Sequence, residues 1–178
     1  MKKIFSCIIQ IVLGTLVILA VIYLTLPKGL LFLWGLNKLG IKAVAQEIEE
    51  GFLGAELKEV ILEIKGETLK FSKMYLTLGN VVFSCGNGQI KVKYSPFSKI
   101  EFDVSNIRGR CIGENRFKEI DGKFFYQFNR GFTGSLQMKE VNYVIKAPKV
   151  LIRLKGDEVE IYVPNLGIRR RFKIEKIL

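Results

Sequence analysis

The chain lacks the residue that most enzymes use for proton transfer. It has 178 residues and no histidine. Histidine is the commonest general base and the usual partner of a serine or cysteine nucleophile, so Ser-His and Cys-His pairs are both impossible. Glu47, Glu49 and Glu50 precede a glycine and are typical of a solvated acidic run. We therefore predict that the protein is not an enzyme.

Two glycine-containing segments lack the features of a phosphate-binding loop. They are Gly51-Phe52-Leu53-Gly54 and Gly86-Asn87-Gly88. A phosphate-binding loop needs a following Lys-Ser/Thr pair and a strand–loop–helix setting, and neither segment has them. The sequence predicts no cofactor.

The three cysteines do not form a metal-binding pattern. Cys7 lies in an apolar run, and Cys85 and Cys111 are far apart in the chain. Zinc sites are built mainly from closely spaced Cys and His, so we expect no metal site. Cys85 and Cys111 form a disulfide if the body of the protein is exported, or else remain free buried thiols. The sequence leaves both states open.

The charge balance is strongly basic, with 28 Lys and Arg against 17 Asp and Glu. Such an excess suits nucleic acid, anionic lipid or an acidic partner. Most lysines alternate with apolar residues, as in Gln89–Tyr94, and this is the pattern of the outward face of a half-buried strand. Only Arg169-Arg170-Arg171 forms a local cluster. The pattern argues against nucleic acid and favours a solvated face or an anionic membrane surface.

An uncharged, largely apolar run follows Met1-Lys2-Lys3 and extends from Ile4 to Leu26. A bilayer core requires about 20 such residues, whereas a signal peptide has an apolar region of only about 7–15 residues and a small-residue cleavage site. The run is longer, and no such site follows it, so we predict an uncleaved anchor over 1–27 that ends at Pro27. Its membrane-facing residues are Ile4, Ile8, Leu13, Leu16, Leu19, Ile22 and Leu26.

Residues 28–50 are expected to form an interfacial helix or linker. Leu30–Leu39 reads as a short amphipathic helix that lies at the headgroups or caps the following domain, with Trp34 suited to the membrane–water interface. Gly40–Glu50 reads as a second short helix, although a strand beginning at Lys42 fits equally well.

The orientation follows from the short N-terminal tail. Lys2 and Lys3 lie before the run, and Lys28, Lys38 and Lys42 lie after it, so the positive charges are nearly balanced. A very short basic tail usually stays in the cytoplasm. We therefore predict a single-pass protein of the inner (cytoplasmic) membrane with its C-terminal domain in the periplasm.

Residues 51–178 read as a β-rich extramembrane domain. Many segments alternate with period two, carry β-branched or aromatic residues and are separated by glycines and turns such as Ser95–Ser98 and Lys155–Glu158. Such a series predicts a mainly β fold, a curled antiparallel meander forming a groove or half-barrel. The expected strands cover 60–64, 73–78, 81–84, 89–94, 100–104, 107–112, 122–128, 134–138, 143–146, 150–154, 159–163 and 171–177.

The apolar sides of three expected strands form a candidate groove. These residues are Ile90, Val92, Tyr94, Ile100, Phe102, Val104, Val150, Ile152 and Leu154. Aromatic bulk comes from Phe102, Phe124, Phe125, Tyr126, Phe128 and Phe132. Either a second layer covers this face, or the sheet curls around an open groove.

Three stretches resemble a known group of proteins. They are LNKLGIKAVAQEIEEGFLGAELKEVILEIKGETLKF, RFKEIDGKFFYQFNRGFTGSLQMKEVNYVIKAPKV and VEIYVPNLGIRRRFKI. The first resembles the opening of type II secretion system protein N and of AsmA-like membrane-anchored proteins, and the others resemble the hairpins of their β-sheets. The likeness rests on pattern, and the chain is shorter than AsmA-like lipid bridges.

The resemblance implies two functions of different classes. The first is a non-catalytic accessory or assembly subunit of an envelope secretion machinery, with other secretion subunits as partners. The alternative is a lipid-binding or lipid-transfer groove of the AsmA-like type, with membrane lipids and a bound phospholipid as partners. Neither involves nucleic acid.

Overall fold

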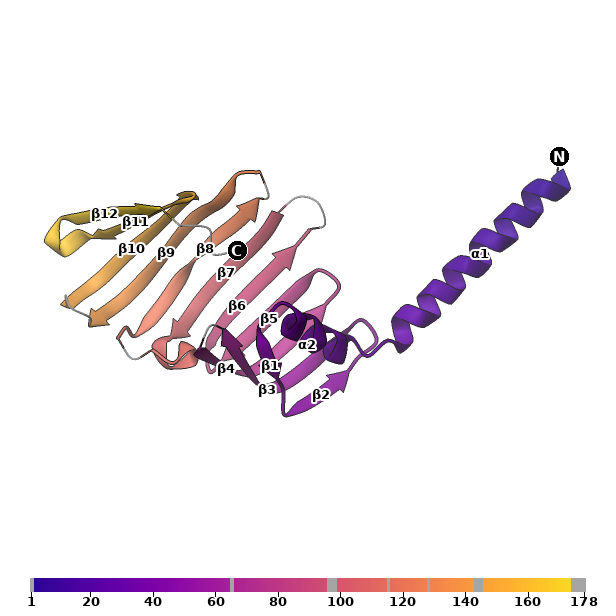
Figure 1. Ribbon diagram of the computed structural model, residues 1–178, viewed down its shortest axis with the longest axis horizontal. Helices are drawn as coiled ribbons and strands as arrows, with labels where there is room; N and C mark the ends of the chain where they lie inside the picture. Colours follow the sequence, from indigo (N-terminus) through magenta and orange to yellow (C-terminus); the bar gives the residue numbers. More distant parts are fainter. Residues whose placement is uncertain are drawn as a thin grey trace.

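Two helices precede a single large β-sheet in the computed structural model (Figure 1). The structure describes residues 2–64, 66–95, 99–114, 116–127, 129–142 and 146–173, with side chains from Val12 onward. Helix α1 (Lys2–Thr25) projects away from the sheet, whereas α2 (Lys28–Lys38) lies against it (Figure 1).

The break between the helices lies at Pro27, as the sequence predicts. Helix α1 ends at Thr25, whose hydroxyl donates to the carbonyls of Val21 and Ile22 at 3.0 and 3.1 Å. Pro27 has no amide hydrogen to continue the helix, and it precedes the first turn of α2. Neither helix alone is long and apolar enough to cross a membrane within the described side chains, but Val12–Thr25 and Lys28–Lys38 meet that standard together, bent by 77°.

The described strands form one open antiparallel sheet, which confirms the predicted mainly β fold and antiparallel meander. The order is β1-β3-β4-β5-β6-β7-β8-β9-β10-β11-β12, with β2 also paired to β3. The strands are β1 (Lys42–Val44), β2 (Glu47–Glu50), β3 (Gly54–Ile64), β4 (Glu67–Thr77), β5 (Asn80–Cys85), β6 (Gly88–Tyr94), β7 (Lys99–Arg108), β8 (Glu119–Gln127), β9 (Gly131–Asn142), β10 (Lys146–Gly156), β11 (Glu158–Val163) and β12 (Ile168–Lys173).

The prediction of a short helix over Gly40–Glu50 is wrong, and the strand alternative is right. β1 and β2 pair with β3 in one continuous register, with Ala43 opposite Leu62 and Ile48 opposite Leu57. A short isolated helix is marginal in water, whereas the edge of β3 supplies backbone partners for both pieces. Residues 28–50 therefore comprise α2 and two edge strands.

The strand predicted over Ile107–Ile112 also requires correction. β7 ends at Arg108, and Gly109–Ile112 forms a short 3-10 helix, η1. This turn brings Cys111 back toward Cys85 on β5, which an extended segment could not do. A second 3-10 turn, η2 (Pro164–Leu166), joins β11 to β12.

Several predicted segments lie partly outside the described residues. They include Pro96–Ser98 of the expected turn, Phe128, residues 143–145 and the part of the last strand beyond Lys173. The hairpin expected at Lys155–Glu158 is confirmed, because Lys155 pairs with Glu158 across Gly156 and Asp157.

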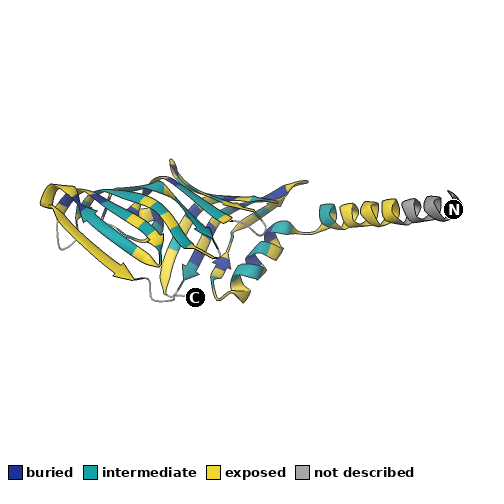
Figure 2. Ribbon diagram, turned by 90° about the horizontal axis from the view of Figure 1, so that it is seen from above, coloured by how far each residue is buried: buried dark blue, intermediate teal, exposed yellow. Residues whose placement is uncertain are grey.

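Three strand residues other than glycine have positive φ values, and one of them lies at a β-bulge. Glu59, Asn106 and Glu140 have φ values of 48°, 53° and 48°, which is uncommon for residues other than glycine. At Asn106 the register between β7 and β8 shifts, and its amide donates to the Asp121 carboxylate at 2.7 Å. Bulges increase local bending and twist, and the sheet is visibly curled (Figure 2).

The main hydrophobic core lies where α2 packs on the first strands. Leu33 of α2 is buried with Leu57, Val60 and Met74 of β3 and β4. Two smaller clusters lie farther along the sheet, one around Ile107 and one around Val150 and Val163.

Candidate apolar groove

The structure brings all nine predicted groove residues onto one face of the sheet, here called the inner face. Residues directly opposite each other on paired strands share a face. One row of such pairs contains Ile90, Val104, Gly122, Leu136, Ile152 and Ile161. The next row contains Val92, Phe102, Phe124, Gly134, Leu154, Val159 and Phe172. A third contains Tyr94, Ile100, Tyr126, Phe132 and Gly156. Val150 lies opposite Met138, which pairs with Ile120.

The inner face is only partly covered. Val104 and Val150 are buried, but Phe102, Ile152 and most of their neighbours are half-buried, and Tyr94 is exposed. The same intermediate burial runs along the curled sheet beyond α2 (Figure 2). Side chains of a closed core are almost entirely removed from water. Within the described residues, therefore, the inner face beyond α2 is an open apolar surface.

Aromatic rings concentrate in the middle of this face. Phe102 and Phe124 are stacked, with ring centroids 4.6 Å apart and planes 8° apart. Phe132 lies between Phe124 and Tyr126, at centroid distances of 6.3 and 4.9 Å. The groove prediction omitted Phe124, Tyr126 and Phe132. The period-two alternation of Phe124 with Tyr126 was the signal that could have found them.

Two glycines make room for these side chains. Gly122 and Gly134 have φ values of 150° and 144°. A Cβ on Gly134 would lie 2.4 Å from the carbonyl oxygen of Lys123 and 2.5 Å from the Cα of Phe124. The backbones of β8 and β9 therefore approach closely at glycine, and Phe124 lies directly opposite Gly134. Only glycine fits this position.

The other face, the outer face, carries paired charges. Lys58 contacts Glu47 at 3.1 Å and also Glu49, and Lys73 contacts Glu56 at 2.8 Å. These pairs explain why so many lysines alternate with apolar residues. Exposed pairs of this kind contribute little stability, about 0–1 kcal/mol each.

Glu119 and Asp121 are two carboxylates that share one cation on this face. Lys139 lies 2.7 Å from Glu119 and 2.8 Å from Asp121. Burial raises the pKa of Asp121, but hydrogen bonds from Lys139 and from the Asn106 amide outweigh it, so the net shift is downward. A carboxylate held ionised in this way suits an ion pair better than proton donation.

The predicted arginine cluster divides between the two faces. Arg171 donates through Nε to Glu160 at 3.0 Å, and Arg169 lies 3.7 Å from the same carboxylate. A third arginine, Arg153, is also 3.7 Å away. These cations, Arg171 foremost, lower the pKa of Glu160. Arg170 pairs opposite Ile161 and therefore lies on the inner face near its edge.

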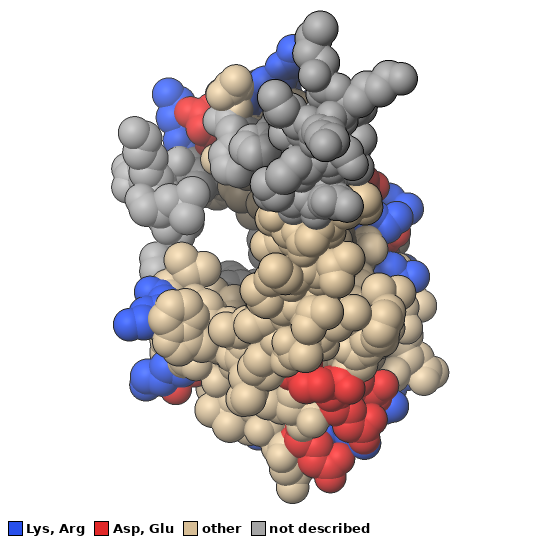
Figure 3. Space-filling model, turned by 90° about the vertical axis from the view of Figure 1, so that its right-hand side faces the viewer, with Lys and Arg blue, Asp and Glu red and all other residues tan. Residues whose placement is uncertain are grey.

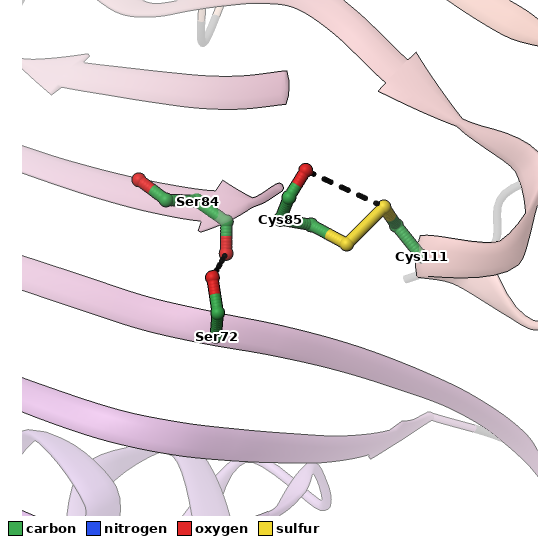
Figure 4. The surroundings of a disulfide bond; sticks show 4 residues. All are labelled: Ser72, Ser84, Cys85 and Cys111. Carbon is green, nitrogen blue, oxygen red and sulfur yellow. Dashed lines mark hydrogen bonds between the residues drawn. A yellow bond between two sulfur atoms is a disulfide. The ribbon is translucent and has the colours of Figure 1, made fainter. Parts of the chain in front are cut away.

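A disulfide joins Cys85 to Cys111 (Figure 4). Their Cα atoms are 6.0 Å apart, within the usual range for such bonds. Cys111 is fully buried, so the bond ties η1 to the end of β5 on the inner face. Beside it, the Ser72 hydroxyl donates to the Ser84 carbonyl at 3.0 Å and links β4 to β5 (Figure 4). The sequence left open whether these cysteines form a disulfide or remain free thiols, and the structure has the disulfide.

The predicted anchor residues are exposed along α1. Leu13, Leu16, Leu19 and Ile22 present apolar side chains outward, as do Leu26 just after α1 and Trp34 on α2. The side chains of Ile4 and Ile8 lie outside the described ones.

The comparisons with known proteins identify no relative of this chain, so its function has to be argued from the fold and the inner face. No protein-family model, no curated protein and no solved structure matches this chain. In the part of the chain that the structure describes, no group of three or more acidic, Cys or His residues could hold a metal ion.

Proposed function

We propose that the protein is a membrane-anchored, non-catalytic β-domain of the cell envelope whose inner face binds the acyl chains of lipids. The observation that carries this proposal is the register of half-buried apolar and aromatic side chains across β6–β11. A contiguous exposed apolar surface on a globular protein marks a binding site, because burial yields about 25 cal/mol per Å² of apolar area.

The chemistry of the inner face suits a long, flexible apolar ligand. Its rows contain aliphatic and aromatic side chains with glycines between them, and the charged Arg170 lies on β12 at the edge of the sheet. The apolar rows cross the six neighbouring strands β6–β11, which gives an apolar surface about 24 Å wide at the usual strand spacing. Acyl chains can lie along such a surface without needing hydrogen-bond partners.

Three features support the membrane part of the proposal. The helical backbone of α1 covers nearly all of the uncharged run, and its described leucines point outward. Lys2 and Lys3 precede the run, which favours a cytoplasmic N-terminus and a periplasmic sheet. A Cys85–Cys111 disulfide suits an oxidising compartment such as the periplasm.

A second candidate function is favoured by the last strand. β12 pairs with β11 and, among the described residues, with no other strand, and all six of its residues are exposed. An exposed edge strand is a template for pairing with another chain. This supports an accessory or assembly subunit of an envelope secretion machinery, the role that the resemblance to type II secretion system protein N implies.

Native mass spectrometry of the full-length protein extracted in mild detergent tests the proposal. Lipid binding predicts adducts with phospholipid masses that persist after detergent removal in the instrument. Co-purified protein subunits without any phospholipid adduct would contradict the lipid proposal and favour the accessory-subunit function.

A further inference from the structure

Exposed apolar side chains gather on one rim of the sheet, close to the helices. Phe52 and Leu53 lie in the loop between β2 and β3, and Leu78 follows β4 in the loop to β5. Their exposed fractions are 70%, 64% and 75%. Large apolar side chains at hairpin tips are unfavourable in water, so these three side chains at two tips favour an apolar environment.

The same rim continues onto the helices. Leu53 and Leu78 line a depression of about 290 Å³ together with Tyr23 at the end of α1 and Leu31 of α2. Among the described residues of its lining, Lys28 alone is charged, and its ammonium group lies 3.4 Å from the Gly51 carbonyl oxygen and 5.2 Å from the Tyr23 ring centre. Lys28 therefore connects the junction of the helices to the loop that carries Phe52 and Leu53.

We propose that the protein has a membrane seat, an apolar surface that lies in the headgroup region of the bilayer crossed by α1. The membrane seat consists of Phe52, Leu53 and Leu78 together with the outward side chains of α2, which are Leu30, Leu31 and Trp34. The inference rests on the anchor in the proposed function. The membrane seat binds the phospholipid surface of the bilayer on the side to which the sheet is exported. The 77° bend between the helices fits this arrangement, because it turns α2 to lie along the surface when α1 crosses the bilayer.

The surroundings of the seat have the composition of a membrane interface. Lys38 lies 5.5 Å from the Trp34 ring, and aromatic rings beside cations are frequent at headgroup level. Figure 3 faces the end of the molecule from which α1 emerges, and there the described surface is mostly uncharged, with cationic side chains at its flanks and acidic ones gathered at one edge. Farther along the same rim, the described loop residues include the charged Arg130 and Asp157.

A seat at this rim brings the inner face to the bilayer. Leu76 and Tyr94 line the depression and also lie on β4 and β6 of the sheet. Tyr94 belongs to the inner-face row that continues to Ile100 and Tyr126. An acyl chain can therefore leave the leaflet at the depression and reach the inner face without crossing water.

Tryptophan fluorescence in proteoliposomes tests the seat with the full-length chain. Trp34 is the only tryptophan, so a Trp34→Phe background allows single reporters at Phe52→Trp, Leu78→Trp and Leu166→Trp. Leu166 is the matched control, because it is also an exposed leucine but lies in η2 on the opposite rim. The quencher is a phospholipid brominated on its acyl chains.

The seat predicts that Phe52→Trp and Leu78→Trp lose much of their emission in brominated vesicles, whereas Leu166→Trp keeps its emission. Equal quenching of Phe52→Trp and Leu166→Trp would overturn the seat. A fourth reporter, Leu19→Trp in α1, separates this failure from failure of the anchor. Quenching of Leu19→Trp without quenching of Phe52→Trp refutes the seat alone, and no quenching of either refutes the anchor as well.

Discussion

Glu160 illustrates how a single side chain organises the outer face of the last strands. Its carboxylate, on β11, contacts Arg171 and Arg169 of β12 and Arg153 of β10. The arginines lower its pKa below the ordinary value of 4.5. A depressed carboxyl pKa stabilises the folded state above the unfolded pKa, and this contribution is lost as the pH falls through the folded pKa.

We therefore expect Glu160→Gln to lower the melting temperature at neutral pH but not in strong acid. Circular dichroism melts of the detergent-solubilised protein between pH 7 and pH 2 measure the difference in melting temperature between variant and wild type. This difference should become smaller below pH 4.5. Glu158→Gln is the control, since its carboxylate makes no ion pair with any of the residues that the structure describes. A constant difference at every pH would show that the arginines do not act through the charge of Glu160.

The Cys85–Cys111 bond should stabilise the sheet by restricting its unfolded state. The sequence separation of 26 residues corresponds to about 3–4 kcal/mol in the chain-entropy account of disulfides. The double variant Cys85→Ala/Cys111→Ala should therefore melt well below the wild type. Adding reductant should lower the wild-type melting temperature and leave the double variant unchanged. A wild type insensitive to reductant under unfolding conditions would contradict the pairing.

At the residue scale, period-two alternation was sufficient to predict which side chains share the inner face. It works for Ile90, Phe102 and Ile152 because side chains on a strand alternate faces. It could not predict the stacking of Phe102 on Phe124, since that contact depends on the register between β7 and β8. The disulfide was undetermined for the same reason, because the pairing depends on the turn η1.

The curl of the sheet is an element-scale property that should depend on close backbone approach between β8 and β9. Gly134→Ala places a Cβ against the β8 backbone and forces alanine to adopt a φ near 144°. We expect a loss of at least about 1–3 kcal/mol, the usual cost of such backbone strain. Gly79→Ala is the control, because its Cβ would approach nothing more closely than the Tyr94 carbonyl oxygen at 3.9 Å. Equal melting temperatures for the two variants would contradict this reason for the curl.

The anchor is the second element-scale expectation. Wild-type protein should remain with the membranes after carbonate extraction. Leu16→Arg combined with Leu19→Arg should impair insertion, at about 2.5–3.5 kcal/mol for each arginine near the bilayer centre. Leu166→Arg, far from α1 in the sequence, should not. Recovery of wild type in the soluble fraction would contradict the anchor.

The sequence predicted the elements well where the pattern was long and failed where it was short. β6 and β11 were predicted within one residue of their observed limits, whereas β10 extends beyond the predicted 150–154 at both ends. Gly40–Glu50 carries apolar residues at spacings that fit both a helix and a strand. Pairing with β3, a tertiary interaction, decided the outcome. Ile107–Ile112 failed because the disulfide and the turn at Gly109 override its strand-like composition.

At the scale of the whole molecule, the burial is uneven from one end to the other. Leu57, Val60 and Met74 are fully buried beneath α2, whereas the inner-face rows beyond it are mostly half-buried. The hairpin connections keep neighbouring strands paired, and beyond α2 the residues that the structure describes form no second layer over this face. A sheet built in this way keeps an apolar surface available for a ligand, and this availability is the central claim of the proposed function.

The measurement that tests this claim most directly is the lipid content of Phe102→Glu compared with Ser105→Glu. Both substitutions add one carboxylate to β7. Phe102 lies in the middle of the inner face, whereas Ser105 is exposed and does not belong to the inner face. Both proteins are extracted in the same mild detergent, and bound phospholipid is quantified by native mass spectrometry. The account predicts that Phe102→Glu loses the phospholipid while remaining folded by circular dichroism, and that Ser105→Glu retains it. Equal phospholipid in the two folded variants, or none in the wild type, would contradict it.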